Sequence, residues 1–134
     1  MKKINIIYLK IFLIIFINLV SLNQVKAEEL EDGIYIIRSS ISNNYVLDLN
    51  NASTNNGTNI QLYNNNNTDA QKWYIKRISN NNYTIATQLN KNMVIDVAGG
   101  IKKDRTNIQL YHSNNTKAQK WIFEKIELAN LDSG

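Results

Sequence analysis

The sequence predicts an all-β protein built from repeated units, and three observations support this fold class. First, residues 32–77 align without a gap with residues 80–125, at a constant offset of 48 positions. Second, each unit contains short runs of β-branched and aromatic residues in which apolar and polar side chains alternate. Third, no stretch after residue 27 shows a sustained helical period with capping residues. We therefore expect a barrel-like assembly of β-leaves, although propeller blades have a similar repeat length.

The repeat is independent of the asparagine-rich composition of the chain. Residues 58–63 recur unchanged as residues 106–111, and Gln71-Lys72-Trp73 recurs as Gln119-Lys120-Trp121. Asparagine runs can create chance identity, but they cannot align tryptophan, tyrosine, aspartate and glutamine. The duplication is therefore established by the residues themselves.

Each leaf is predicted to contain four strands. In the first leaf they lie at residues 34–37, 45–49, 59–63 and 72–75. Val46 and Asp48 alternate with Leu47 and Leu49, as a half-buried strand requires. Asparagine, serine, threonine and glycine fill the intervals, as turns require.

Residues 1–27 are predicted to form a signal peptide helix. Three lysines begin the segment, an apolar stretch follows at residues 11–20, and Val25 and Ala27 supply the small residues before a cleavage site. An uncleaved anchor is the alternative, because the apolar span of residues 4–22 approaches the roughly 20 residues that cross a bilayer. Either interpretation places the remaining chain outside the cytoplasm, and cleavage predicts a secreted protein.

The charge of the chain resides in this first segment. The formal net charge is +4, but four of the fifteen basic residues and none of the eleven acidic ones precede residue 28. The mature chain is therefore neutral and has no basic run interleaved with aromatic residues, so we expect neither nucleic acid nor, after cleavage, a membrane as partner.

Composition also argues against catalysis. The chain has no cysteine and a single histidine, which excludes disulfides, thiolate zinc sites and thiol nucleophiles and makes a histidine-dependent triad hard to build. Glycoside hydrolysis needs two carboxylates within about 5–10 Å, whereas Asp48 and Asp96 occupy equivalent positions in separate leaves. We expect no catalytic residue, no metal and no cofactor.

The two Gln-Lys-Trp segments resemble the Q-x-W repeats of ricin-type lectin domains. The resemblance extends over residues 32–126, because an aspartate in the second run and a Gln-Leu-Tyr in the third keep the family's order. It implies a β-trefoil of three leaves around a pseudo-threefold axis, with sugar binding as the usual activity. In this chain the resemblance covers two of the three leaves, so we expect an incomplete β-trefoil.

The expected lectin-type domain spans residues 28–134. Repeat one occupies residues 32–77 and repeat two residues 80–125, while residues 129–134 resemble the entry to a third. Two leaves alone would expose strand edges and apolar faces. We therefore expect either a truncated reading frame or a homo-oligomer that completes the trefoil.

Each leaf supplies residues suited to a sugar. Carboxylates and amides exchange hydrogen bonds with ring hydroxyls, and an aromatic ring stacks on the apolar C–H face. The resemblance implies that the aspartate accepts from hydroxyls, the tyrosine stacks and the last glutamine steadies the polar contacts. The candidate carbohydrate-binding residues are Asp48, Gln61, Tyr63 and Gln71 in the first leaf, and Asp96, Gln109, Tyr111 and Gln119 in the second.

Other roles remain open for several of these residues. Galactose-binding members have an asparagine where this chain has Ala70 and Ala118, and the nearest substitutes in sequence are Asn66, Asn67, Asn114 and Asn115. The tryptophans suit a core better than a ligand, and Gln71 and Gln119 suit either a turn or a site. The leading interpretation is a binder of galactose-type or cell-wall glycans. The alternatives are a protein-interaction fragment and an accessory module of a larger cell-wall or glycoside hydrolase.

Overall fold

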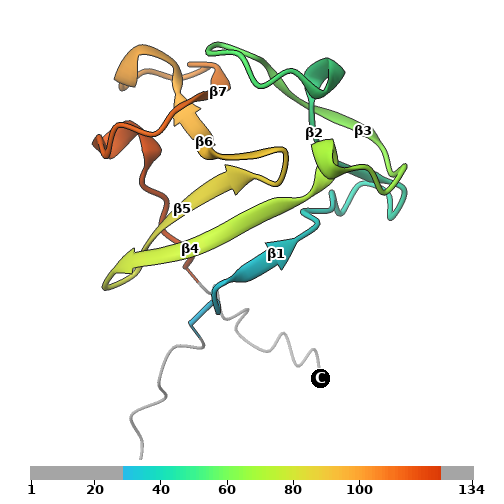
Figure 1. The fold of residues 1–134 in the computed structure, drawn as a ribbon, viewed down its shortest axis with the longest axis horizontal. Coiled ribbons are helices and arrows are strands. Elements are labelled where there is room, and N and C mark those ends of the chain that lie inside the picture. Colours follow the sequence, from blue (N-terminus) through green and yellow to red (C-terminus); the bar gives the residue numbers. More distant parts are fainter. Residues whose placement is uncertain (1–28, 125–134) are drawn as a thin grey trace, which may run out of the picture.

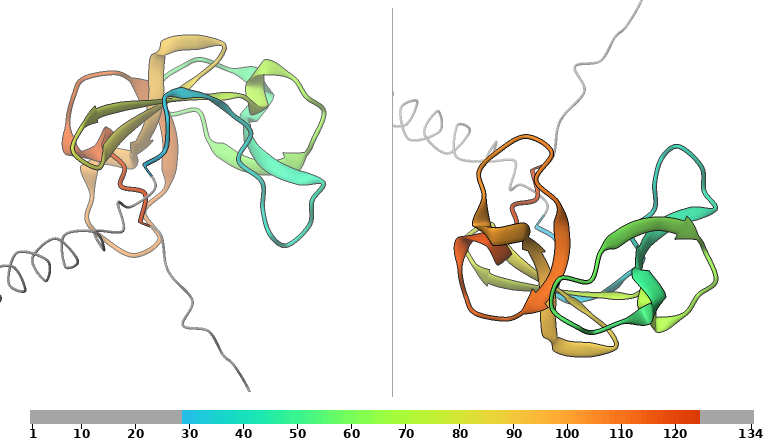
Figure 2. Two further views of the ribbon diagram at one scale, coloured as in Figure 1. Left: turned by 90° about the horizontal axis from the view of Figure 1, so that it is seen from below. Right: turned by 90° about the horizontal axis from the view of Figure 1, so that it is seen from above.

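A computed structural model describes residues 29–124 and contains two β-leaves that lie side by side (Figures 1 and 2). The predicted signal peptide, residues 1–27, and the predicted start of a third repeat, residues 129–134, lie outside the described residues. Within residues 29–124, every helical segment is a 3-10 turn of three residues. None of these segments is long and apolar enough to span a bilayer.

Seven strands and four short 3-10 turns make up the two leaves. The four runs predicted for the first leaf each overlap one of its four strands. In the second leaf the fourth run is an isolated bridge between Trp121 and Tyr83. The first leaf contains β1 (Gly33–Tyr35), β2 (Tyr45–Leu49), η1 (Asn50–Ala52), β3 (Ile60–Asn64), η2 (Asp69–Gln71) and β4 (Trp73–Ser79). The second contains β5 (Asn82–Thr87), β6 (Asn90–Val97), η3 (Ala98–Gly100), β7 (Ile108–His112) and η4 (Lys117–Gln119).

All the strand pairs are antiparallel, which confirms the predicted all-β class. One sheet has the order β1-β4-β5-β6-β7, and β2 pairs with β3 in a second sheet. The β4–β5 hairpin joins the leaves, with Trp73 opposite Thr87 and Ile75 opposite Ile85. Figure 1 shows β4 as the long strand between β1 of the first leaf and β5 of the second. The register of this hairpin therefore fixes one leaf against the other.

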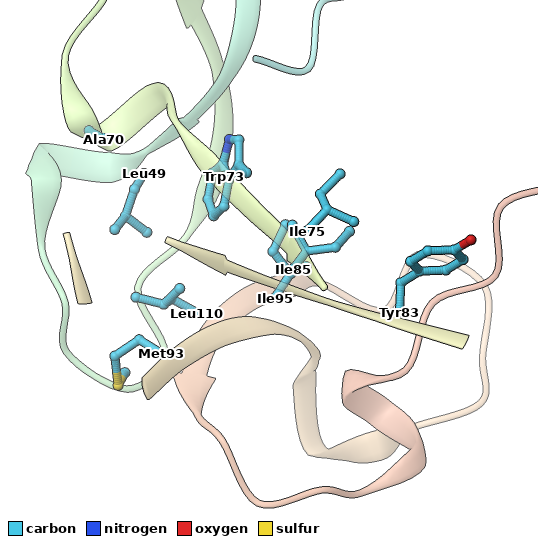
Figure 3. Close-up of a cluster of buried hydrophobic side chains, with 9 residues drawn as sticks. All are labelled: Leu49, Ala70, Trp73, Ile75, Tyr83, Ile85, Met93, Ile95 and Leu110. Carbon is cyan, nitrogen blue, oxygen red and sulfur yellow. The ribbon is translucent and has the colours of Figure 1, made fainter. Parts of the chain in front are cut away.

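The two leaves share one apolar core. Leu49, Trp73 and Ile75 come from the first leaf, and Tyr83 and Ile85 begin the contribution of the second. Figure 3 shows the side chains of Trp73, Ile75 and Ile85 packed together around the β4–β5 hairpin. As expected for a core residue, Trp73 is fully buried. The indole N–H of each tryptophan has a hydrogen-bond acceptor. Trp73 donates to the carbonyl oxygen of Leu47 and Trp121 donates to that of Ile95, both at 3.2 Å.

A loop of the first leaf covers β7 of the second. Gly57 N donates to the carbonyl oxygen of Leu110 at 2.8 Å, and Leu110 N donates to the carbonyl oxygen of Thr58 at 2.8 Å. The side chain of Leu110 is fully buried in the core, whereas Leu62, its counterpart in β3, is 45% exposed. No loop among residues 29–124 pairs with Leu62 in this way. The described residues thus form two leaves of a three-leaf arrangement. The edge at β3, where a third leaf would pack, is uncovered.

Candidate functional site

The centre of the candidate site in the first leaf is the carboxylate of Asp48. The alternation of β2 turns this side chain away from its apolar neighbours, yet it is only 6% exposed. Gln61 lies directly opposite on β3 and donates from Nε2 to one carboxylate oxygen at 3.0 Å. Gln71 donates from Nε2 to the other oxygen at 3.2 Å. Because a buried charge is costly without hydrogen bonds, the two amides are what stabilise Asp48 in this position.

Gln71 ties the same carboxylate to the loop that follows β3. Its Nε2 also donates to the carbonyl of Asn64 at 2.8 Å, and its Oε1 accepts from Asn66 N at 2.9 Å and Asn67 N at 3.2 Å. Asn67 adopts a left-handed backbone conformation, with φ of 58°, which asparagine tolerates better than most residues. Gln71 is itself fully buried, so it positions Asp48 and the loop from behind.

The second leaf repeats this network with nearly the same distances. Gln109 donates to Asp96 at 3.0 Å, and Gln119 donates to its other oxygen at 3.2 Å. Gln119 also donates to the carbonyl of His112 at 3.0 Å and accepts from Asn114 N at 2.8 Å. The chain therefore holds two copies of one preorganised carboxylate.

A cavity opens beside each carboxylate. The cavity at Asp48 has a volume of about 340 Å³, and the one at Asp96 about 450 Å³. Each is bordered by a solvent-exposed tyrosine, 51% exposed for Tyr63 and 37% for Tyr111. An acceptor carboxylate, a side-chain amide and an exposed aromatic ring thus face the same space in each leaf.

The structure brings six of the eight predicted residues to these cavities and places the other two behind them. Asp48, Gln61 and Tyr63 line the first cavity, and the second leaf repeats them with Asp96, Gln109 and Tyr111. Gln71 and Gln119 line neither cavity and contact the carboxylates from the buried side. Ala70 and Ala118 also line the cavities, together with Asn66 and Asn114 from the loops clamped by the glutamines.

Sequence reasoning missed the turns that form the opposite walls. In the first leaf this wall is Asn51 and Ala52, both with positive φ, and in the second it is Gly99 and Gly100. The Gly-Gly pair could have indicated such a turn, since glycine adopts positive φ more readily than other residues. The contribution of Leu89 could not be predicted from the sequence, because it reaches the first cavity from the turn between β5 and β6 of the second leaf.

These cavities are suited to binding polyhydroxylated molecules. Ionised carboxylates accept hydrogen bonds from adjacent hydroxyls, amides both donate and accept, and tyrosine rings pack on apolar faces. In residues 29–124, no three histidine, aspartate or glutamate side chains come together as metal ligands would. The two carboxylates Asp48 and Asp96 line separate cavities in separate leaves.

A family model described as ricin-type β-trefoil lectin domain-like matches the chain twice, over residues 22–111 and residues 69–134. The two matches overlap and together extend from residue 22 to the end of the sequence. No curated protein sequence matches the chain.

Solved structures of similar fold include designed and natural proteins. The designed 3-fold symmetric protein ThreeFoil is 26% identical, with a TM-score of 0.66 over 73% of this chain and 69% of its own. A Polyporus squamosus lectin, solved with a human-type influenza-binding epitope, is 26% identical, with a TM-score of 0.62 over 74% of this chain and 35% of its own. An exo-β-1,3-galactanase from Clostridium thermocellum is 23% identical and similar in fold, with a TM-score of 0.62 over 70% of this chain and 20% of its own. The chain thus spans about two thirds of the designed protein and much smaller shares of the two natural ones.

Proposed function

We propose that this chain, which belongs to the family of ricin-type β-trefoil lectin-like domains, is a carbohydrate-binding module without catalytic activity. The observation that supports this most directly is the duplicated site. In both leaves an aspartate held by two glutamine amides borders a cavity beside an exposed tyrosine. Such preorganisation is costly for a merely structural residue, because it withdraws a carboxylate from water.

In the proposed complex, the free lone pairs of Asp48 and Asp96 accept hydrogen bonds from neighbouring hydroxyls of one sugar ring. Tyr63 and Tyr111 pack on the apolar face of that ring. Asn66 and Asn114 line the same cavities and offer the amide that Ala70 and Ala118 lack. Each site is open to solvent, so tight binding of a polymer requires both sites to engage it together.

We further propose that the protein is secreted and binds a galactose-type or cell-wall glycan. The pattern of residues 1–27 supports secretion. The aspartate–tyrosine pair supports a sugar with two adjacent hydroxyls and an exposed C–H face. Among the residues that line the two cavities, the only other carboxylate is Asp69, which is paired with Lys72 at 2.9 Å, and this supports binding rather than hydrolysis.

A pull-down on insoluble polysaccharides, together with a glycan array, tests the proposal. The purified protein should be retained by at least one glycan, and the double variant Asp48→Ala/Asp96→Ala should not be. Asp104→Ala is the matched control, because Asp104 is exposed and lines neither cavity. Circular dichroism must show the same fold in all three proteins. Retention that survives in the double variant, or is absent from every glycan, contradicts the proposal.

The exposed face of β3 favours a second role in self-association. The loop of residues 56–58 pairs with β7 within the chain. Its counterpart in the second leaf, residues 104–106, would pair with β3 of a second copy beside Leu62 in the same way. We propose this copy as the partner of that face. Light scattering should show an oligomer that Leu62→Lys dissociates, and a stable monomer of the unmodified protein would contradict it.

A further inference from the structure

We propose that the two cavities select sugars of different charge: the Asp96 cavity takes a sugar that bears an acidic group, and the Asp48 cavity a neutral one. This inference rests on the proposed sugar binding and names the ligand class of each site. It starts from a reversal of charge between two equivalent residues that line the cavities. Asp69 begins η2 and lines the first cavity, whereas its counterpart Lys117 begins η4 and lines the second.

The neighbouring lysine strengthens the contrast. Lys72 in the first leaf donates to Asp69 at 2.9 Å, so the charges of that pair cancel at the rim of the cavity. Lys120 is the counterpart of Lys72, but its neighbour three residues before is the cation Lys117 in place of the anion Asp69. Neither Lys117 nor Lys120 takes part in an ion pair within residues 29–124. Lys72 and Lys120 do not line the cavities, but each follows a lining residue by three positions. With this neighbouring lysine and the central aspartate counted, the charges at the first cavity sum formally to −1 and those at the second to +1.

The hydrogen bonds to the central aspartates do not distinguish the leaves. The hydrogen bonds from Gln61 and Gln109 to their aspartates are both 3.0 Å, and those from Gln71 and Gln119 are both 3.2 Å. Contacts with sugar hydroxyls should therefore be the same at both sites. The charge of the rim is what remains to separate the ligands.

The cavity walls agree with this assignment. Gly99 and Gly100 have no side chains, and their cavity is about 450 Å³. Asn51, Ala52 and the apolar Leu89 narrow the other to about 340 Å³. A uronic acid carries one more oxygen than the neutral hexose and an anionic carboxylate, so it gains from both the room and the cations of the second leaf. A carboxylate entering the first cavity would instead meet Asp69 and Leu89.

Single-site proteins test this directly. Asp48→Ala leaves only the second site, and Asp96→Ala leaves only the first. Each is titrated, by calorimetry or by ligand-observed NMR, with oligogalacturonate and oligoglucuronate and with the matching neutral galactose and glucose oligomers. Because exposed ion pairs contribute about 0.2–1 kcal/mol each, we expect the second site to prefer the acid about 3- to 10-fold at low salt. This preference should shrink towards unity in about 1 M salt, where the Debye length is about 3 Å.

Exchanging the charges at positions 69 and 117 gives the decisive comparison between the two sites. Lys117→Asp in the second-site protein should abolish or invert its preference, and Asp69→Lys should give the first-site protein a preference for the acid. Lys76→Asp is the control, because it changes the net charge equally at an exposed residue that lines neither cavity. Equal affinity of the second site for acid and neutral sugars, or a preference that Lys117→Asp leaves unchanged, overturns this inference while sugar binding stands. Failure of every oligomer to bind either protein contradicts the proposed function itself.

Discussion

The side-chain amide of Gln71 lies 3.2 Å from the carboxylate of Asp48, and neither group has appreciable contact with solvent. The two residues are 23 positions apart and belong to different elements, η2 and β2. The same pair recurs in the second leaf as Gln119 and Asp96 at the same distance. The glutamine of the repeated Gln-Lys-Trp segment is thus a positioning residue, which joins a buried carboxylate to the loop that borders the cavity.

Replacing Gln71 with alanine should destabilise the protein and silence the first site. The change removes a donor from the buried carboxylate and leaves two loop amides without their acceptor, which costs about 1–3 kcal/mol in unfolding free energy. Urea denaturation measures this cost. Gln88→Ala is the control, because the buried Oε1 of Gln88 has no hydrogen-bond partner among the described residues. Equal losses for Gln71→Ala and Gln88→Ala would contradict the assigned role.

Truncation of two equivalent leucines should have unequal effects. Leu110 is fully buried in the core, whereas Leu62 is 45% exposed. We expect Leu110→Ala to lower the unfolding free energy by about 2–5 kcal/mol, as cavity-forming substitutions do. Leu62→Ala should cost less than about 1 kcal/mol in the dilute monomer. Chemical denaturation at low protein concentration compares them, and similar costs would show that β3 is covered in solution.

The positive-φ turns predict opposite effects for two reciprocal changes. Ala52 has φ of 53°, and its counterpart Gly100 has φ of 61°. Since left-handed backbone costs a residue with a Cβ roughly 1–2 kcal/mol, Ala52→Gly should raise stability by up to about 1 kcal/mol once the added chain entropy of glycine is deducted. Gly100→Ala should lower it by about 1 kcal/mol.

Steric crowding does not explain the expected loss in Gly100→Ala. The new Cβ would lie 3.9 Å from the Cβ of Ala118, which is an ordinary contact. Thermal unfolding followed by circular dichroism gives both values. A stabilised Gly100→Ala variant would contradict the left-handed turn.

Tyr63 offers a test of stacking that is separate from the carboxylate. Its ring is half exposed at the rim of the first cavity, so truncation should leave the fold intact. In the protein whose second site is silenced by Asp96→Ala, Tyr63→Ala should weaken sugar binding about 3- to 10-fold, in line with roughly 0.5–1.5 kcal/mol for aromatic packing. Tyr63→Phe, which keeps the ring, should bind within about twofold of the parent. Equal weakening in both would assign the contribution to the hydroxyl group.

The sequence predicted the fold well because its main signals are local and occur twice. The alternation in β2 and β3 and the aligned tryptophans placed the strands and the core, and the family match confirms the resemblance. The strand ends were less accurate, since β4 extends to Ser79, beyond the predicted run. Its last residues gain their partners from β5 across a tight turn, which a run of apolar residues does not report.

The candidate site was predictable in its centre and unpredictable in its walls. Aspartate, glutamine and tyrosine recur at fixed spacing, so the residue types pointed to a sugar. Whether Gln71 faced the ligand or the interior could not be read from its position. Leu89 enters the first cavity from the other leaf, and such a contact follows from leaf packing alone.

By itself, the sequence determined the duplication, the all-β class and the eight candidate residues, because each is a matter of residue type and spacing. Only the tertiary structure decided that Gln71 and Gln119 stand behind the carboxylates, that Leu110 is buried in the core, and that Leu62 is left exposed. Identical hexapeptides surround these two leucines. Their environments differ because burial depends on which leaf packs against a strand, and no local pattern encodes that neighbour.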